Sequence, residues 1–214
     1  VAFIFKEMDF SEKNLAKWKE ELAAYPQRIE ALGKQDLPSL DQFYRLHLPP
    51  AIKERNPTPH ITASELHKLL QWKLARGKWR PRLLDFVKSL DDESVRTASE
   101  KAFKAIPNIR NAISELTVLK GVGPATASAV LSAYSPDFPF MSDEAMDSAL
   151  GNHRDYTLKQ FVALTEKLRQ KAKELSTDGD CFTPSDVERA LWSASVNAKM
   201  QSKGGTKSSK KRKR

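Results

Sequence analysis

An acid that follows a pair of glycines is the arrangement in this chain best suited to chemistry. In the stretch LKGVGPATASAVLSAYSPDFPFMSDEAM, Asp143 comes twenty residues after Gly123. A carboxylate near a helix N-terminus is kept ionised by the helix dipole, and it can stabilise a developing positive charge or orient water. The same residues also suit a helix start, because Ser142 or Asp143 can cap the segment SDEAMDSAL. Catalysis and capping therefore both remain open for Asp143.

The glycine pair is predicted to form a tight turn between two helices. Gly121 and Gly123 permit positive φ and close backbone approach, because neither carries a Cβ, and Pro124 suits the first turn of the second helix. The N–H groups at the start of that helix form a ready phosphate site, and such contacts position a duplex without reading its sequence. The spacing favours DNA binding over a purely structural turn, and the residues expected to contact DNA are Lys120, Gly121, Val122, Gly123, Ala125 and Thr126.

A second candidate is the basic and aromatic segment QWKLARGKWRPRLLDF, which has no acid between Lys73 and Arg82. Cationic side chains neutralise phosphates, and indoles stack on unpaired bases. We predict DNA contacts from Lys73, Arg76, Lys78 and Arg80, and the candidates for a base pocket are Trp72, Trp79 and Tyr44. The alternative is a solvated turn whose tryptophans pack inward, and core packing is the favoured role of each individual Trp.

The elements that must position these residues are helices, and the pattern predicts an all-α fold. Capping residues mark helix starts at Thr62, Asp91, Asn108, Thr157 and Thr183. A first helix is expected from Ser11 until Pro26 intervenes, and only short helical turns across the proline-rich residues 37–61. Gly77 and Pro81 separate two further helices, and VAFIF at the start is the only credible strand.

The 214 residues carry a net charge of +9, most of it near the C-terminal end. The last fourteen residues contain seven Lys and Arg and no acid, whereas the rest carries 29 basic against 27 acidic residues. We expect one helical domain over residues 1–200 and a disordered basic tail over residues 201–214, whose composition cannot form a core. The tail ends in a run that favours nuclear import, with a solubilising terminus as the alternative: Lys210, Lys211, Arg212, Lys213 and Arg214.

Composition also limits the classes of site. One cysteine excludes an internal disulfide and a four-cysteine iron–sulfur or zinc site, and the four histidines show no metal-ligand spacing. We therefore expect neither a metal nor a cofactor. No apolar run approaches the roughly 20 residues that span a bilayer, so no membrane partner is expected.

The glycine turn, the small-residue helix after it and the spaced acid resemble the helix-hairpin-helix DNA glycosylase superfamily. The resemblance covers residues 62–151, and the helices up to about residue 199 are compatible with it. It implies a multi-helix glycosylase-like fold, duplex DNA as partner, and a flipped base whose N-glycosidic bond is hydrolysed. In that family the acid at the position of Asp143 stabilises the sugar cation, much as carboxylates do in glycoside hydrolysis.

Two departures from the family refine this expectation. Bifunctional members carry a lysine where this chain has Ala125, so the resemblance implies a monofunctional glycosylase without lysine-dependent lyase activity. Members commonly place a short polar residue and then His or Asn after the acid, where this chain has Glu144 and Ala145. The leading hypothesis is a nuclear base-excision-repair glycosylase. The alternatives are a catalytically inactive DNA- or chromatin-binding adaptor and a helical protein-interaction domain.

Overall fold

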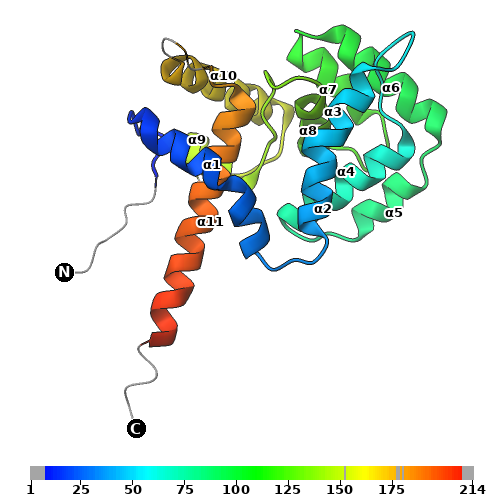
Figure 1. The fold of residues 1–214 in the computed structure, drawn as a ribbon. Coiled ribbons are helices and arrows are strands. Elements are labelled where there is room, and N and C mark those ends of the chain that lie inside the picture. Colours follow the sequence, from blue (N-terminus) through cyan, green and yellow to red (C-terminus); the bar gives the residue numbers. More distant parts are fainter. Residues whose placement is uncertain (1–7, 152, 177–178, 180, 209–214) are drawn as a thin grey trace.

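The computed structural model describes residues 8–151, 153–176, 179 and 181–208, and these residues form helices without a strand (Figure 1). The all-α prediction is confirmed, and VAFIF lies outside the described residues. A π-helical turn, Phe43–His47, joins two of the helices. The α-helices are α1 (Leu15–Ala31), α2 (Leu37–Gln42), α3 (Leu48–Lys53), α4 (Ala63–Arg76), α5 (Arg82–Lys88), α6 (Asp92–Ala105), α7 (Ile109–Thr117), α8 (Pro124–Tyr134), α9 (Asp143–Leu150), α10 (Leu158–Leu175) and α11 (Pro184–Ser208).

The predicted capping residues start their helices as expected. Thr62 and Glu65 form a capping box at α4, in which the Thr62 hydroxyl accepts from the Glu65 N–H and the Glu65 carboxylate accepts from the Thr62 N–H. At α11 the pair Thr183 and Asp186 makes the same reciprocal bonds. The side chains of Asp91, Asn108 and Thr157 accept the third N–H of α6, α7 and α10. Local chemistry therefore sets these five helix starts.

The prolines end fewer helices than the sequence predicted. Pro26 lies inside α1, which begins after the cap residue Asn14 and continues to Ala31. Burial of Trp18, Tyr25 and Ile29 offsets the lost hydrogen bond, which costs about 3 kcal/mol. In the proline-rich segment, helical structure is continuous from residue 37 to residue 53, because prolines occupy the first turns of α2 and α3, where a missing N–H costs little.

The C-terminal helix is longer than expected. Helix α11 continues to Ser208, beyond residue 201, at which the sequence predicted a disordered tail to begin. Adding a residue to an existing helix gains one hydrogen bond without a new nucleation cost, which favours such extension. The terminal basic run, residues 210–214, lies outside the described residues.

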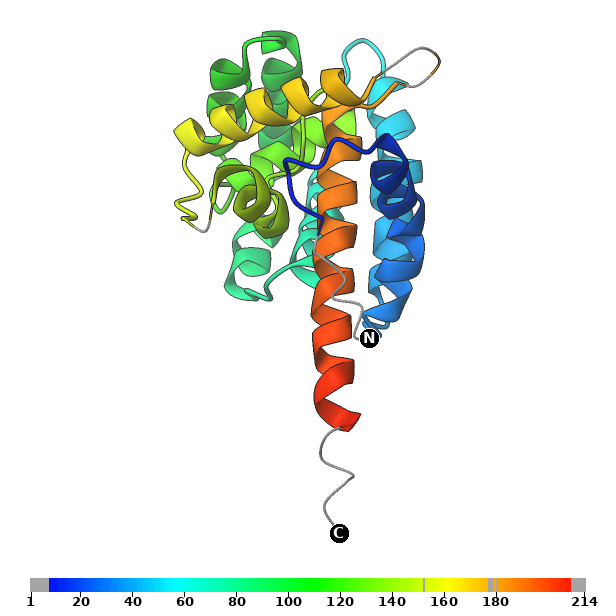
Figure 2. The same cartoon turned by 90° about the vertical axis from the view of Figure 1, so that its left-hand side faces the viewer.

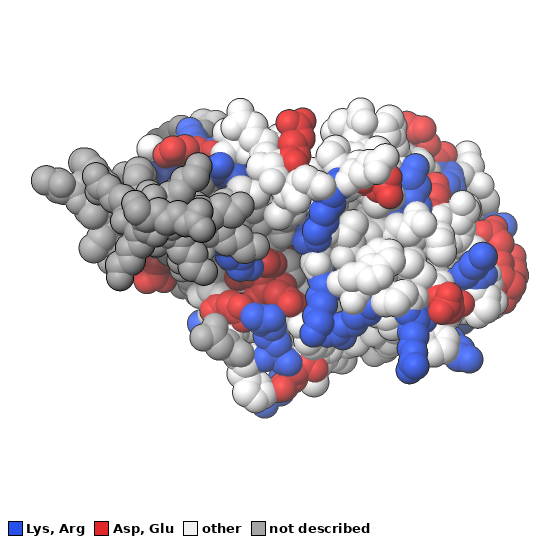
Figure 3. All heavy atoms as spheres, turned by 90° about the horizontal axis from the view of Figure 1, so that it is seen from below, with Lys and Arg blue, Asp and Glu red and all other residues white. Residues whose placement is uncertain are grey.

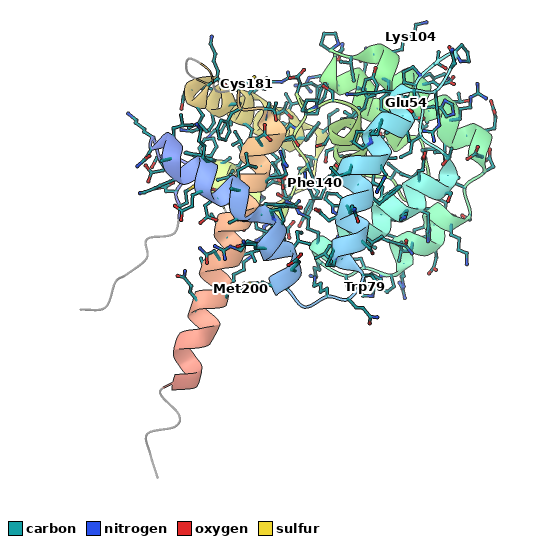
Figure 4. The ribbon with its side chains drawn as sticks, in the orientation of Figure 1. Glu54, Trp79, Lys104, Phe140, Cys181 and Met200 are labelled. Atoms are coloured by element: carbon teal, nitrogen blue, oxygen red, sulfur yellow. The ribbon has the colours of Figure 1, made fainter. Side chains whose placement is uncertain are left out.

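The helices form two groups that pack against each other. Helices α2–α8 make up one group, and α1, α9, α10 and α11 make up the other (Figure 1). Figure 2 shows α1 and α11 side by side and α10 crossing near the start of α11. Phe140, on the linker between α8 and α9, lies where the two groups meet (Figure 4). No helix in the described part of the chain is both long and apolar enough to cross a membrane.

Candidate functional site

A cavity of about 420 Å³ lies where the end of α4, the glycine turn and the start of α9 converge. This volume falls in the range of roughly 300–1,000 Å³ that small-molecule sites occupy. Its walls include the turn residues Gly121 and Gly123, the α4 residue Lys73 and the acid Asp143. The structure thus brings the predicted acid and the predicted phosphate-binding turn to one cavity.

The linker between α8 and α9 explains why the acid and the turn meet. Ser128, on the small-residue face of α8, accepts a hydrogen bond from the Met141 N–H at 3.0 Å. Phe138, Phe140 and Met141 are buried, so the linker is anchored to the core immediately before α9 begins. The first residue of α9 is therefore fixed relative to α8.

The two glycines of the turn have different roles. Gly121 has a φ of 85°, and a Cβ at this position would lie 2.7 Å from the Phe86 Cβ, so both its conformation and its surroundings require glycine. Gly123 caps α8 with a φ of −93°, and a Cβ there would meet no atom within 4 Å. Both glycines permit a positive φ, but of the two only Gly121 adopts one. Gly123 instead leaves open space in front of the helix.

The N-terminus of α8 has donors available for an anion. The Gly123 carbonyl accepts from the N–H groups of Thr126 and Ala127, both at 2.9 Å. Within the described chain, no hydrogen bond occupies the N–H groups of Gly123 and Ala125, and no side chain caps the helix. Unpaired N–H groups at a helix N-terminus favour a phosphate oxygen.

Capping of α9 is performed by Ser142, not by Asp143. The Ser142 hydroxyl accepts a hydrogen bond from the Ala145 N–H at 3.3 Å. Asp143 is the first helical residue, and its side chain lines the cavity. The carboxylate is thereby left available for other partners.

Those partners come from the loop between α9 and α10. The Arg154 guanidinium lies 2.9 Å from Asp143 Oδ2, and the Tyr156 hydroxyl donates to Oδ1 at 2.8 Å. Arg154 also bonds Asp147, and its pKa is raised by that bond and by the charge of Asp143. Burial and the bond to Asp143 raise the pKa of Tyr156, so its hydroxyl stays protonated. The Asp143 side chain remains 33% exposed.

Arg154 and Tyr156 were not among the residues predicted from the sequence. They follow Asp143 by 11 and 13 residues across the end of α9, so no helical spacing joins them to it. Tyr156 has a φ of 51°, a conformation that non-glycine residues rarely adopt. The signal available in the sequence was only a short polar loop after Gly151.

Lys73 lies in the last turn of α4 and lines the same cavity. Burial and the nearby positive charge of Arg80 lower its pKa to about 8, while the Asp143 carboxylate opposes this shift. Among the described residues, no group of three or more His, Cys, Asp or Glu is placed to hold a metal ion.

The prediction that Arg76 contacts DNA is wrong. Its side chain is buried, and the guanidinium makes hydrogen bonds of 2.9–3.2 Å to the Glu188 carboxylate on α11. It also lies 4.6 Å from the Trp192 ring centroid. Arg76 therefore joins the two helix groups, since every partner it has is internal.

Trp72 and Tyr44 do not form a base pocket. Trp72 is fully buried, its ring stacks on Tyr44 with centroids 3.5 Å apart, and its indole N–H donates to Asp41 at 2.8 Å. The Tyr44 hydroxyl donates to the Ala129 carbonyl at 2.9 Å. Core packing, the favoured role of each Trp, is thus correct for Trp72.

Unlike the other two base-pocket candidates, Trp79 is not buried: it lies on the loop between α4 and α5 and is 60% exposed. Figure 4 labels it at the lower end of the α2–α8 group, and Figure 3 views the molecule from below, where Lys and Arg side chains, with a few acids among them, border a largely uncharged area. Lys78 and Arg80 flank Trp79, are exposed and line the cavity. This loop is the cationic and aromatic rim of the cavity.

The other residues of the glycine turn that were predicted to contact DNA differ in their exposure to solvent and to the cavity. Lys120 is exposed, with its Nζ 5.2 Å from the Phe86 ring centroid, but it does not line the cavity. Val122 and Thr126 are buried, so Val122 can offer a ligand only its backbone, whereas Thr126 lines the cavity wall.

Comparisons with protein-family models, curated proteins and solved structures found no match for this chain. The function must therefore be argued from the chain's own residues.

Proposed function

We propose that this protein binds duplex DNA and acts as a monofunctional DNA N-glycosylase on a damaged or mismatched base. The observation that carries the proposal is the Asp143 carboxylate in the wall of a cavity beside the open N-terminus of α8. A phosphate at that terminus would hold the backbone of the strand. A nucleotide turned out of the duplex would then enter next to the carboxylate.

The rim of the cavity suits a DNA backbone. Lys78 and Arg80 are exposed cations on a single loop, and Trp79 between them offers a ring for stacking. Gly123 lets a strand approach the N–H donors closely, because no side chain projects there. These features supply affinity and position without choosing a base sequence.

Asp143 would assist cleavage of the C1′–N bond. As the base leaves, positive charge develops on the sugar, and an ionised carboxylate nearby stabilises it and orients water. In the free protein, Arg154 and Tyr156 occupy both carboxylate oxygens. Arg154 keeps a second partner, Asp147, so Asp143 can turn toward the sugar without leaving the guanidinium unpaired.

The same ion pair favours a second candidate function. A carboxylate that bonds Arg154 and Tyr156 also fixes the loop after α9, which is a structural role. In that case the protein is a DNA- or chromatin-binding adaptor that binds duplexes but releases no base. In either case the proposal includes nuclear import through residues 210–214.

Base release from a panel of damaged and mismatched duplexes tests the proposal, with gel-shift binding measured in parallel. Asp143→Asn should lower base release by about 100-fold or more while DNA binding persists. The matched control is Asp147→Asn. This substitution removes the charge of the other carboxylate that bonds Arg154, but Asp147 lies outside the cavity lining. This control should remain active.

Two results would count against catalysis. Equal activity of the parent and Asp143→Asn would exclude the assigned role of Asp143. DNA binding by the parent without base release from any duplex of the panel would favour the adaptor.

A further inference from the structure

A second cavity, of about 660 Å³, is lined by α1, α2, the π-helical turn, α3, the end of α8 and the start of α11. It falls in the size range of small-molecule sites, and it shares no lining residue with the cavity that holds Asp143. Residues 124–126 of α8 line the first cavity, and residues 132–134 line the second. At 1.5 Å per helical residue, about 12 Å of α8 separate the two. The second cavity is therefore not part of the proposed DNA site.

Much of the wall of this second cavity is apolar. Leu22 and Ile29 come from α1, Pro38 from α2, and Leu46 from the π-helical turn. Leu46 is 63% exposed although its side chain is large and apolar. A ligand that covered these side chains would remove apolar surface from water, which is favourable. The π-helical turn that carries Leu46 is itself a rare element, found frequently at functional sites.

Two guanidinium groups enter this cavity, one from each helix group. Arg45 belongs to the π-helical turn and Arg189 to α11, and their side chains are 16% and 27% exposed. Burial and then the positive charge of Arg45 lower the pKa of Arg189, so the two charges act on each other. The cavity thus holds two neighbouring and largely buried cations.

The internal contacts of these guanidinium groups use only part of their hydrogen-bonding capacity. Arg45 donates to the Tyr25 hydroxyl at 2.7 Å, and Arg189 donates to the Asp186 carboxylate. Arg45 Nε lies 3.3 Å from Asp41 Oδ2 without hydrogen-bond geometry, and Arg189 Nε is buried without a hydrogen-bond partner. A guanidinium has five N–H donors and no acceptor. The unmet capacity in this cavity therefore calls for an acceptor.

The two buried acids beside the arginines are held by other donors. Asp41 Oδ1 accepts from the Tyr25 hydroxyl at 2.7 Å and from the Trp72 indole N–H at 2.8 Å. Asp186 Oδ2 accepts from the Thr183 N–H at 2.9 Å and from the Thr183 hydroxyl at 2.6 Å. These bonds fix both carboxylates in place, so the remaining N–H groups are left for a ligand.

The charges of the lining limit what that ligand can be. Cations and acids are equal in number there: Arg45, Lys53 and Arg189 against Glu30, Asp41 and Asp186. A monoanion adds one uncompensated charge to this balanced set, and a phosphate dianion adds two. Because an uncompensated charge is costly away from water, a carboxylate suits the site better than a phosphate.

We propose that the second cavity binds a small organic carboxylate. Arg45 and Arg189 hold the carboxylate, since the planar fork of a guanidinium matches its two oxygens. The apolar body of the ligand lies against Leu46 and the side chains of α1. The bound anion joins the two helix groups and stabilises the folded protein. This site goes beyond the proposed function and does not depend on DNA binding.

Titration calorimetry and thermal melts of the full chain test the proposal. The probes share one body and differ in the head group: 4-phenylbutyrate, 4-phenylbutan-1-ol and 4-phenylbutyl phosphate. Octanoate serves as a second carboxylate with a different body. The parent should bind 4-phenylbutyrate at least about 10-fold more tightly than the alcohol, and more tightly than the phosphate. Both carboxylates should raise the melting temperature.

Two variants locate the binding. Arg189→Gln should weaken 4-phenylbutyrate binding about 10- to 100-fold and leave the alcohol unaffected, because only the carboxylate uses the guanidinium. Leu46→Glu places a negative charge on the exposed side of the cavity, so it should weaken carboxylate binding without lowering the melting temperature of the free protein. The control is Arg110→Gln on α7, which is exposed, lies outside both cavity linings and should bind like the parent.

Four results would overturn the proposal. They are no binding of either carboxylate up to about 1 mM, equal affinity of the parent for the acid and the alcohol, tighter binding of the phosphate, and carboxylate affinity that Leu46→Glu leaves unchanged. If Arg189→Gln melts far below the parent, Leu46→Glu decides the location of the site. None of these measurements involves DNA, so the carboxylate site and the glycosylase can each fail without the other.

Discussion

Replacing each glycine of the turn by alanine separates a structural role from a binding role. For Gly121→Ala, the left-handed φ of 85° costs about 1–2 kcal/mol. The new Cβ also lies 2.7 Å from the Phe86 Cβ, and relieving such an overlap costs about 1–3 kcal/mol. We expect the free energy of unfolding to fall by roughly 2–5 kcal/mol, and the melting temperature by roughly 4–20 °C for a protein of this size.

Gly123→Ala should behave differently. Its φ of −93° suits any residue, and its Cβ meets nothing within 4 Å, so stability should change by only about 1 kcal/mol or less. Its methyl group would project into the space before the N–H donors of α8 and weaken DNA binding. Thermal melts and gel shifts of both variants measure the two effects. Equal stability losses, or unchanged DNA affinity in Gly123→Ala, would refute the division of roles.

Two further predictions concern charged residues. Arg76→Met should lower the free energy of unfolding by about 3–5 kcal/mol in denaturant titrations, because it leaves the Glu188 carboxylate buried without its partner. Adding Glu188→Leu should recover most of that loss, and no recovery would show that the pair is not the cause. Lys78→Ala and Arg80→Ala should each weaken binding to all duplexes equally and reduce the salt dependence of the affinity by about one counterion. An unchanged salt slope would exclude phosphate contacts at this rim.

Helix starts could be predicted from the sequence because they depend on residues only a few positions apart. Thr62 and Glu65 supply both halves of a capping box, whatever the rest of the chain does. Prolines were harder to interpret, because their effect depends on position and packing. Pro26 is tolerated within α1, where burial offsets its cost.

The side chains of α4 and of the loop after it also could not be assigned their burial and partners from the sequence. Lys73 and Arg76 were candidate DNA contacts, and Trp72 and Trp79 were candidates for a base pocket. The fold buries Trp72 on Tyr44, pairs Arg76 with Glu188, and leaves Trp79 exposed. Whether a cationic side chain contacts a phosphate or a buried acid depends on which helix packs beside it. The acid that pairs with Arg76 is Glu188, which is 112 residues away in the sequence.

The sequence by itself determined the all-α class, the capped helix starts, and a glycine turn followed by an acid. These features follow from backbone preferences and hydrogen bonds between near neighbours in the chain. Tertiary structure alone decided that Asp143 turns toward a cavity with Arg154 and Tyr156 as partners, and that Lys73 enters that cavity from α4. The physical reason is that the charge, burial and partners of these groups are set by segments distant in sequence, which only the packed core brings together.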